Sequence, residues 1–189
     1  MLYLNDDIAG FDFEAALPLL SDQRREQALK FKFEQGRKTC AMAYLLLCEG
    51  LRKEYGITER PVFEYGEHGK PFIIGHPDIH FNVSHCREGV ICVVSDRPVG
   101  VDIESIREYR ESLVRYTMND REVQQIEHAE HPDVEFIRLW TMKEAVLKCS
   151  GQGLINDMRM VLDKRSLELI TKTDPAGRYA YSVCYGEKR

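Results

Sequence analysis

The sequence predicts an α+β protein, because helical patterns are followed by strand patterns twice along the chain. Residues 21–56 have the apolar spacing that is typical of helices, and residues 62–104 contain short runs of strand character. A second helical region at residues 119–151 is again followed by strand patterns, up to residue 184. This order favours a pseudo-repeat of two α+β halves, although the halves share no internal sequence repeat.

The first half is expected to contain two helices and then short strands. Ser21 is the predicted N-cap of a helix that reaches Phe31. A second helix follows Gly36 and ends at Gly56, since glycine is favoured just past a helix C-terminus. Strands are expected at residues 62–65, 71–74, 79–83 and 90–95. A turn at residues 96–98 then leads into a strand that begins at Val99.

The second half is expected to begin with a capped helix. Asn119 is followed three residues later by Glu122, which is the pattern of a capping box. A further helix spans residues 133–149 and ends at Gly151. Strands near residues 159–162, 167–171 and 179–184 complete the predicted elements.

Composition and charge exclude several classes of protein. The 189 residues are 43% hydrophobic and 30% charged, as in ordinary globular domains. A net charge of −5 has the opposite sign to the basic footprint of a general nucleic-acid binder. No apolar run approaches the ~20 residues of a membrane span, and the N-terminal residues lack the basic and apolar regions of a signal peptide. We therefore expect a cytoplasmic protein with no nucleic-acid or membrane partner.

The cysteines agree with a reducing compartment. They are Cys40, Cys48, Cys86, Cys92, Cys149 and Cys184. None forms a Cys-x-x-Cys pair, and each lies in or beside an apolar stretch, as buried thiols do.

Asp102 and Glu104 are the first candidates for a chemical role. Residues 99–104 alternate between apolar and other positions, which is typical of a half-buried strand. Side chains two residues apart on a strand point the same way, about 7 Å apart. The two carboxylates therefore share one face, and a cation between them would relieve their repulsion. The alternative is that this face of the strand is simply solvated.

Glu144 and Lys148 are the second candidates. They are four residues apart on a predicted helix and so lie on one face. A third carboxylate with an ammonium group beside it suits metal-assisted phosphate chemistry, which needs oxygen ligands for a hard cation and a proton donor near the leaving group. The alternative is a surface ion pair worth roughly 0.2–0.5 kcal/mol. Lys143 points elsewhere on the helix and is expected to face solvent, with a contact to phosphate as the alternative.

These residues belong to a longer pattern of five ordered segments. The segments are Gly69-Lys70-Pro71, His80-Phe81-Asn82-Val83-Ser84-His85, Gly100-Val101-Asp102-Ile103-Glu104, Trp140-Thr141-Met142-Lys143-Glu144-Ala145 with Lys148, and Gly151-Gln152-Gly153-Leu154. This pattern resembles the 4′-phosphopantetheinyl transferases, specifically the larger, surfactin-synthetase-activating type. The third and fourth segments are the most specific ones.

The resemblance implies a reaction and an architecture. The reaction is transfer of 4′-phosphopantetheine from coenzyme A to a serine of an apo acyl- or peptidyl-carrier protein, which leaves 3′,5′-ADP. The architecture is two similar α+β halves with the active site at their interface. Residues 1–98 would form the half that binds coenzyme A, and residues 99–189 the magnesium-binding and catalytic half. Because short members of the superfamily build the site between subunits, two halves in one chain imply a monomer.

The resemblance also implies roles for single residues. Asp102, Glu104 and Glu144 would bind Mg²⁺, or Mn²⁺, together with the pyrophosphate of coenzyme A. Glu144 or a metal-bound water would be the base for the serine hydroxyl. Lys148 would contact coenzyme A and protonate or stabilise the departing 3′,5′-ADP.

Further coenzyme A contacts follow from the same resemblance. Ser84, His85 and Lys70, with the adjacent Pro71, would lie at the phosphates. The residues implied for the 3′-phosphate are Lys30, Arg37, Lys38 and Thr39, near the start of the second helix, where the helix N-terminus favours an anion.

Three alternatives remain open at this point. Another magnesium-dependent phosphoryl-transfer enzyme or hydrolase could use the same three carboxylates, but it would lack the Gly-Lys-Pro and Ser-His segments in this order. A non-catalytic coenzyme A-binding module would be expected to have lost a metal carboxylate or Lys148. A purely structural protein would leave the recurrence of these acidic and basic residues unexplained.

Overall fold

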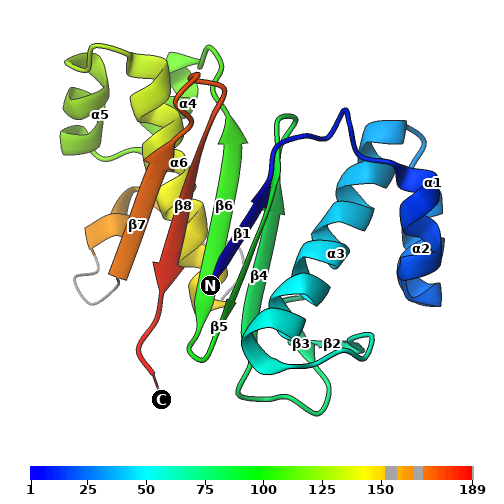
Figure 1. The fold of residues 1–189 in the computed structure, drawn as a ribbon. Coiled ribbons are helices and arrows are strands. Elements are labelled where there is room, and N and C mark those ends of the chain that lie inside the picture. The colour runs from blue at the N-terminus through cyan, green and yellow to red at the C-terminus, as the bar shows by residue number, and fades with distance from the viewer. Residues whose placement is uncertain (152–156, 164–167, 189) are drawn as a thin grey trace.

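Two three-stranded antiparallel sheets lie at the centre of the molecule, and each is covered by one long helix (Figure 1). The computed structural model describes residues 1–151, 157–163 and 168–188. The first sheet has the strand order β1-β5-β4 and packs against α3 (Glu34–Tyr55). The second has the order β6-β8-β7 and packs against α6 (Pro132–Ser150). This arrangement of helices and sheets agrees with the predicted α+β class.

The strands of the two sheets come from both ends of the chain. Those of the first sheet are β1 (Leu2–Asn5), β4 (His80–His85) and β5 (Val90–Ser95). Those of the second sheet are β6 (Val99–Ser105), β7 (Glu168–Thr173) and β8 (Tyr179–Tyr185).

The central strand β5 is apolar on both faces, because it lies between two layers of the core. Val90, Cys92 and Val94 pack beneath α3. Ile91 and Val93 point the other way, toward the apolar side chains of the second sheet. A strand buried on both faces reads as a continuous apolar run, which is what the sequence Val-Ile-Cys-Val-Val shows.

The alternation of residues 99–104 predicts a half-buried strand. Strand β6 is instead buried on both faces over its first five residues. Its apolar positions pack against the first sheet, and α6 covers the other face. Gly100 explains the close approach of the helix. A Cβ atom at this position would lie 2.1 Å from the Ala145 carbonyl oxygen and 2.3 Å from the Cys149 amide nitrogen. Only glycine leaves room for the α6 backbone, so the helix lies directly over Asp102.

Strands β4 and β6 are joined by side chains. The Oδ1 atom of Asn82 accepts a hydrogen bond of 2.8 Å from the Val101 amide, and the Ser84 hydroxyl accepts one of 3.4 Å from the Ile103 amide. Polar side chains thus bond edge amides of β6 across the seam between the two sheets. Ser84 is thereby held next to the strand that carries Asp102.

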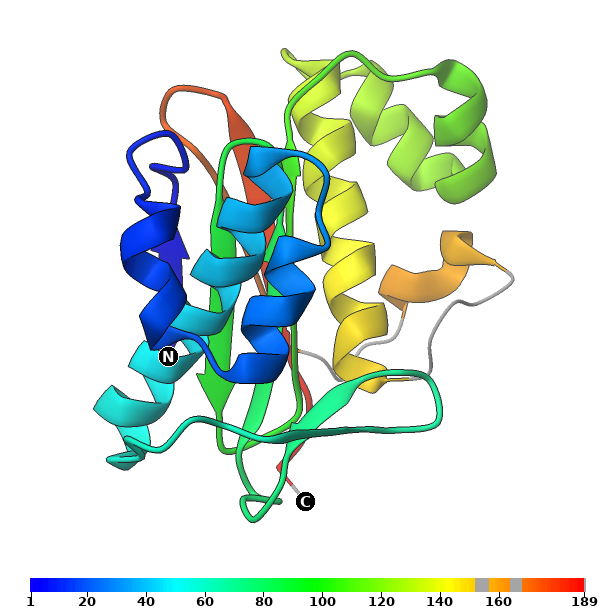
Figure 2. The ribbon, with the colours of Figure 1, turned by 90° about the vertical axis from the view of Figure 1, so that its right-hand side faces the viewer.

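The remaining elements surround this core. They are α1 (Phe13–Ala16), the 3-10 helix η1 (Leu17–Leu19), α2 (Asp22–Leu29), β2 (Phe63–Tyr65), β3 (Pro71–Ile73), α4 (Glu111–Thr117), α5 (Asp120–Glu127) and the 3-10 helix η2 (Met158–Asp163). Strands β2 and β3 form a hairpin that extends toward the C-terminal end of α6 (Figure 2). No helix among the described residues combines the length and the apolar content that crossing a membrane requires.

The helix boundaries set by local capping are confirmed. Ser21 accepts the Arg24 amide as N-cap, and Asn119 forms the expected capping box with Glu122. Gly56 and Gly151 end α3 and α6 in the left-handed conformation.

Other boundaries differ from the prediction. Helix α2 ends at Leu29, before Phe31, and α3 begins at Glu34 rather than after Gly36. β1, α1 and α4 are absent from the predicted set.

One predicted strand is wrong. Residues 159–162 lie in the 3-10 helix η2. The carbonyls of Met158 and Arg159 accept hydrogen bonds from Lys143, so they are not available to a strand ladder. The strand predicted at 167–171 appears as β7, although residue 167 lies outside the described residues, as do Gln152, Gly153 and Leu154 of the fifth motif.

Candidate active site

Asp102 lies at the point where β4, β6 and α6 meet. Its side chain is almost fully buried, with 4% of the residue exposed. Its Oδ1 atom accepts hydrogen bonds from the Ser84 hydroxyl at 2.9 Å and from the Lys148 ammonium at 2.5 Å. Its Oδ2 atom is also buried and has no hydrogen-bond partner among the described residues. A buried carboxylate oxygen without a partner is costly, so this atom marks a place where a cation or a donor can bind.

Lys148 is placed by the last turn of α6. Its Nζ atom bonds Asp102 and also donates to the Ser84 hydroxyl at 3.1 Å. Lys148 therefore forms its ion pair with Asp102 on another element, and not with Glu144 on the same helix. The surface ion pair considered from the sequence is wrong, because Gly100 brings α6 so close to β6 that Lys148 reaches the strand.

Glu104 and Glu144 carry their charge at an electrostatic cost. Burial, followed by the negative charge of Asp102, raises the pKa of each carboxyl above its ordinary value. Asp102 also faces α6 rather than water, so the solvated face considered from the sequence is not present at this residue. Three carboxylates thus influence one another across the interface between β6 and α6.

The three carboxylates are not preassembled as a metal site. Among the described residues, no three His, Cys, Asp or Glu side chains are arranged so that they could hold one ion. Asp102 is instead paired with Lys148. The donor set nevertheless fits a hard divalent cation, since it offers carboxylate oxygens, one of them buried and unpartnered.

Lys70 reaches the same region from the β2–β3 hairpin. Its Nζ atom donates to the carbonyls of Lys148, Cys149 and Val99 at 2.7, 3.1 and 3.0 Å. The pKa of Lys70 lies below its usual value, because the effect of burial exceeds the opposing effect of the nearby Cys149. These bonds place an ammonium group at the C-terminal carbonyls of α6, where positive charge is favourable.

A cavity of about 250 Å³ lies beside Lys70. It is lined by His68, Gly69, Lys70, Glu144, Leu147, Lys148 and Gly151. The structure thus brings Lys70 together with Glu144 and Lys148, and Pro71 follows directly as the first residue of β3.

His85 ends β4, one residue beyond Ser84. Partial desolvation and the charge of Lys148 lower the pKa of the imidazole below its usual value. The lowered pKa favours the neutral imidazole, which has one N–H donor and one acceptor nitrogen.

The four residues implied for the 3′-phosphate lie around the start of α3. Lys30 is exposed at the end of α2, and Thr39 is buried with its hydroxyl on the Gly36 carbonyl. Arg37 and Lys38 donate to the carbonyls of Phe31 and Ala9, at 2.9 and 3.1 Å.

The start of α3 is tied to the end of β4. The side-chain amide of Gln35 (Nε2) donates to the Arg87 carbonyl at 3.1 Å, in the turn that follows His85. The first turn of α3 and the turn after β4 are therefore adjacent.

The structure adds residues that sequence reasoning missed. A second cavity, of about 670 Å³, adjoins Glu104. Its other lining residues are Arg107, Glu108, Tyr109, Arg110, Ser112, Leu113, Tyr116, Phe136, Ile137 and Trp140. Among these lining residues, Trp140 is also the first residue of the fourth motif, so the motif was the one sequence feature that pointed to this cavity.

The sequence predicts that Lys143 faces solvent, and this prediction is wrong. It is fully buried and forms an ion pair of 2.7 Å with Glu122. Helical spacing alone gave no indication of this partner, because Glu122 comes from a different helix.

Comparisons with known proteins agree with these observations. Residues 98–184 match the family model described as the 4′-phosphopantetheinyl transferase superfamily. A 4′-phosphopantetheinyl transferase of Bacillus subtilis is 28% identical over 157 residues, which are 81% of this chain and 70% of that protein. The 4′-phosphopantetheinyl transferase HetI of Nostoc sp. is 30% identical over 168 residues, which are 83% of this chain and 68% of that protein. The 4′-phosphopantetheinyl transferase gsp of Aneurinibacillus migulanus is 39% identical over 137 residues, 69% of this chain and 57% of that protein. The identity and coverage of these relatives, together with the family match, show that the chain belongs to the 4′-phosphopantetheinyl transferase superfamily.

Proposed function

We propose that the protein transfers the 4′-phosphopantetheine group of coenzyme A to a serine hydroxyl of an apo acyl- or peptidyl-carrier protein. The serine oxygen forms a bond to the phosphorus that carries pantetheine, and the bond from that phosphorus to 3′,5′-ADP breaks. The hydroxyl proton is taken up by a base, and the products are the holo-carrier and 3′,5′-ADP. The names of the relatives and the family match support this reaction.

One observation carries the proposal. Residues from three separate elements, Ser84 on β4, Asp102 on β6 and Lys148 on α6, meet within 3.1 Å of one another. Each comes from a different motif of the sequence pattern, and the motifs are up to 64 residues apart. Surface residues would have no reason to converge in this way.

The same site is proposed to use Mg²⁺, or Mn²⁺. Asp102, Glu104 and Glu144 would hold the ion, with Asp102 Oδ2 as the oxygen that lacks a partner. When bound, the ion would neutralise charge on the pyrophosphate. Burial first, and then the negative charge of Asp102, raise the pKa of Glu104 and Glu144, and the second of these causes supports the assignment because a cation would balance that charge.

Glu144 is the proposed base. It lines the cavity that also contains Lys70 and Lys148, so its carboxylate faces the space where a substrate can bind. In this role its carboxylate would take the proton of the carrier serine. A water bound to the ion is the alternative base.

Lys148 is the proposed group at the departing 3′,5′-ADP. Its side chain is 31% exposed, so it can reach a substrate while Asp102 and Ser84 orient it. An ammonium so oriented can stabilise the charge that develops as the phosphoanhydride bond breaks.

The other contacts to coenzyme A are proposed on the basis of position. Ser84, His85 and Lys70, with Pro71 beside it, would contact the pyrophosphate. The residues proposed for the 3′-phosphate are Lys30, Arg37, Lys38 and Thr39. The bond between Gln35 and Arg87 supports this placement, because it keeps the start of α3 beside the end of β4.

The domain organisation is part of the proposal. Residues 1–98 would form an N-terminal half that binds coenzyme A, and residues 99–189 a C-terminal half that binds the metal. In support, each half supplies one three-stranded sheet with one long helix on it, apart from small elements. Since both halves belong to one chain, we propose that the protein acts as a monomer.

The proposed location is the cytoplasm. The six cysteines are free thiols, which supports a reducing compartment.

Incubation with coenzyme A, Mg²⁺ and a panel of purified apo-carrier proteins tests the reaction. Intact-protein mass spectrometry should show one phosphopantetheine added to at least one carrier, at its serine. The carriers should come from fatty-acid, polyketide and nonribosomal peptide systems. Absence of the added group on every carrier in the panel would contradict the proposed function.

A further inference from the structure

Lys143 directly precedes the proposed base Glu144, but its side chain leaves α6 in another direction. Successive residues of a helix are about 100° apart around its axis. The Lys143 ammonium donates to Glu122 Oε2 at 2.7 Å and to the carbonyls of Met158 and Arg159 at 2.8 and 3.3 Å. An ammonium has three N–H donors, so these three acceptors use all of them.

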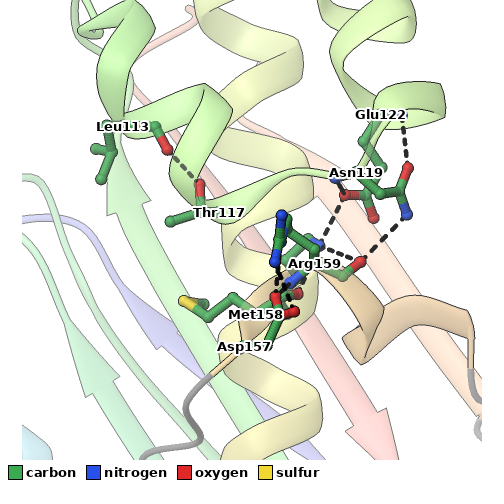
Figure 3. A network of polar contacts seen from close by, with 8 residues as sticks. Leu113, Thr117, Asn119, Glu122, Asp157, Met158 and Arg159 are labelled. Atoms are coloured by element: carbon green, nitrogen blue, oxygen red, sulfur yellow. Dashed lines mark hydrogen bonds and ion pairs between the residues drawn. The ribbon is translucent and has the colours of Figure 1, made fainter.

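The acceptors of Lys143 are themselves fixed (Figure 3). Glu122 Oε2 also accepts the Asn119 amide at 2.8 Å, and Asn119 Oδ1 accepts the Glu122 amide at 3.0 Å. The Asn119 side-chain amide donates to the Arg159 carbonyl at 3.2 Å. The Arg159 guanidinium in turn bonds both oxygens of Asp157 at 2.9 Å. Lys143 therefore ties α6 to a unit made of the first turn of α5 and the start of η2.

We propose that Lys143 is a positioning residue for phosphopantetheine transfer, and that its buried pair with Glu122 sets the rotation of α6 that directs Glu144 into the active site. This inference rests on the proposed function. A second side of α6 is held by the hydrogen bond of 2.8 Å between Thr141 and Ser182 on β8. Lys148 bonds Asp102 from a third position on the helix. Because residues 141, 143 and 148 point in different directions around the axis, the Lys143 pair adds a separate constraint on the rotation of α6.

The required precision is high. Side-chain ends lie roughly 5–6 Å from a helix axis, so a rotation of about 10° moves the Glu144 carboxylate by about 1 Å. A misplacement of that size can lower a rate by about 100-fold. Stability alone gives little reason for a buried ion pair, because an apolar pair of similar volume is often as stable or more so. Positioning supplies the reason.

Three variants separate positioning from stability. Lys143→Met leaves Glu122 buried without its cation and should lower the melting temperature. Glu122→Gln keeps the capping box, because glutamine can also accept the Asn119 amide. The double variant Lys143→Met/Glu122→Gln removes both charges, so its melting temperature should recover most of the loss. Its ion pair between α5 and α6 is nevertheless gone.

Steady-state kinetics with coenzyme A and an apo-carrier give the decisive comparison. In the double variant we expect kcat to remain at least about 10-fold below wild type, with KM for coenzyme A within about 3-fold. Recovery of kcat together with the melting temperature would overturn the inference. Glu122→Gln alone, which is the mildest change, should lower kcat several-fold at unchanged KM. Wild-type kcat in this variant would also overturn the inference, even if the double variant does not fold.

A matched control uses another ion pair of the same helix. Arg138 bonds Glu135 at 2.5 Å, and Glu135 also accepts a hydrogen bond from Gln125 on α5. This pair is therefore another polar contact between α6 and α5, and it does not include Lys143. Arg138→Met/Glu135→Gln should leave kcat and KM unchanged, and a loss of kcat equal to that of the Lys143 double variant would contradict a specific role for Lys143. If the wild-type protein loads no carrier, the proposed function fails and this inference with it, whereas an active wild type with an active double variant refutes the inference alone.

Discussion

The Lys148 ammonium lies 2.5 Å from Asp102 Oδ1, so a cation from α6 neutralises an almost fully buried carboxylate on β6. Lys148 also donates to Ser84 on β4. A single side chain therefore connects the two sheets and the helix at the proposed active site. This contact accounts for Lys148 in a way that a surface pair on one helix does not.

Lys148→Ala should lower kcat more than it raises KM for coenzyme A, because stabilisation of the leaving 3′,5′-ADP develops only as the bond breaks. It should also lower stability by about 1–3 kcal/mol, since Asp102 stays buried without its cation. Lys148→Arg should restore little of the rate, because a planar guanidinium differs in shape and is a poor proton donor. Steady-state kinetics beside melting temperatures measure both effects. A wild-type kcat in Lys148→Ala would remove this residue from the mechanism.

Gly100→Ala should displace α6 or unfold the protein. The new Cβ would lie 2.1 Å from the Ala145 carbonyl oxygen, which is backbone and cannot rotate away. Overpacking typically costs about 1–3 kcal/mol, and backbone contacts are the least able to adjust. Gly66→Ala is the control, because the nearest atom to its Cβ would be 3.6 Å away. Equal melting temperatures and activities for the two variants would show that α6 does not need this approach.

The charge of Glu104 should lower the stability of the metal-free protein at neutral pH. Burial and then Asp102 raise the pKa of this carboxyl in the folded state. Such a group contributes stability that is present below its unfolded pKa of about 4.3 and is lost as pH rises through the folded value. Glu104→Gln should therefore raise the melting temperature at pH 7 in a chelator. This gain should shrink toward about pH 4. A variant that melts below wild type at pH 7 would speak against charge crowding at the site.

Lys70→Met should affect both folding and binding. The substitution removes three hydrogen bonds to carbonyls of Val99, Lys148 and Cys149, and bonds to charged donors are worth about 1.5–3 kcal/mol. His85→Ala removes an exposed ring at the end of β4 and should weaken coenzyme A binding with little change in melting temperature. Calorimetry with coenzyme A and Mg²⁺ measures the affinity of each variant, and melting temperatures measure the effect on folding. Unchanged affinity in both variants would place the coenzyme A pocket elsewhere.

Local chemistry made part of the fold predictable. The caps at Ser21, Gly56, Asn119 and Gly151 depend on residues within a turn of one another, and all four are confirmed. Strand β1 could not be predicted in the same way. It has four residues and pairs with β5, about 90 residues away, so its signal lies in another part of the chain.

The candidate site was predictable in composition but not in contacts. The motifs identified the residues that meet at the seam between β4, β6 and α6. They did not reveal that Gly100 lets the helix cover Asp102, because that depends on the packing of two elements. The buried pair of Lys143 and Glu122 was missed for the same reason. Residues 159–162 were predicted as a strand, but they lie in the 3-10 helix η2, where hydrogen bonds from Lys143 hold the carbonyls of Met158 and Arg159.

The central claim is that the carboxylates beside the α6–β6 interface perform the transfer, and carrier loading by Glu144→Gln tests it most directly. The measurement is the rate of phosphopantetheine addition to an apo-carrier by intact-protein mass spectrometry, with coenzyme A and Mg²⁺, for this variant and for wild type. Because removal of a crowded charge relieves repulsion, Glu144→Gln should melt no lower than wild type. It should nevertheless load almost no carrier, and excess EDTA should stop the wild type. Loading at the wild-type rate by the folded variant, or undiminished loading in EDTA, would contradict the account.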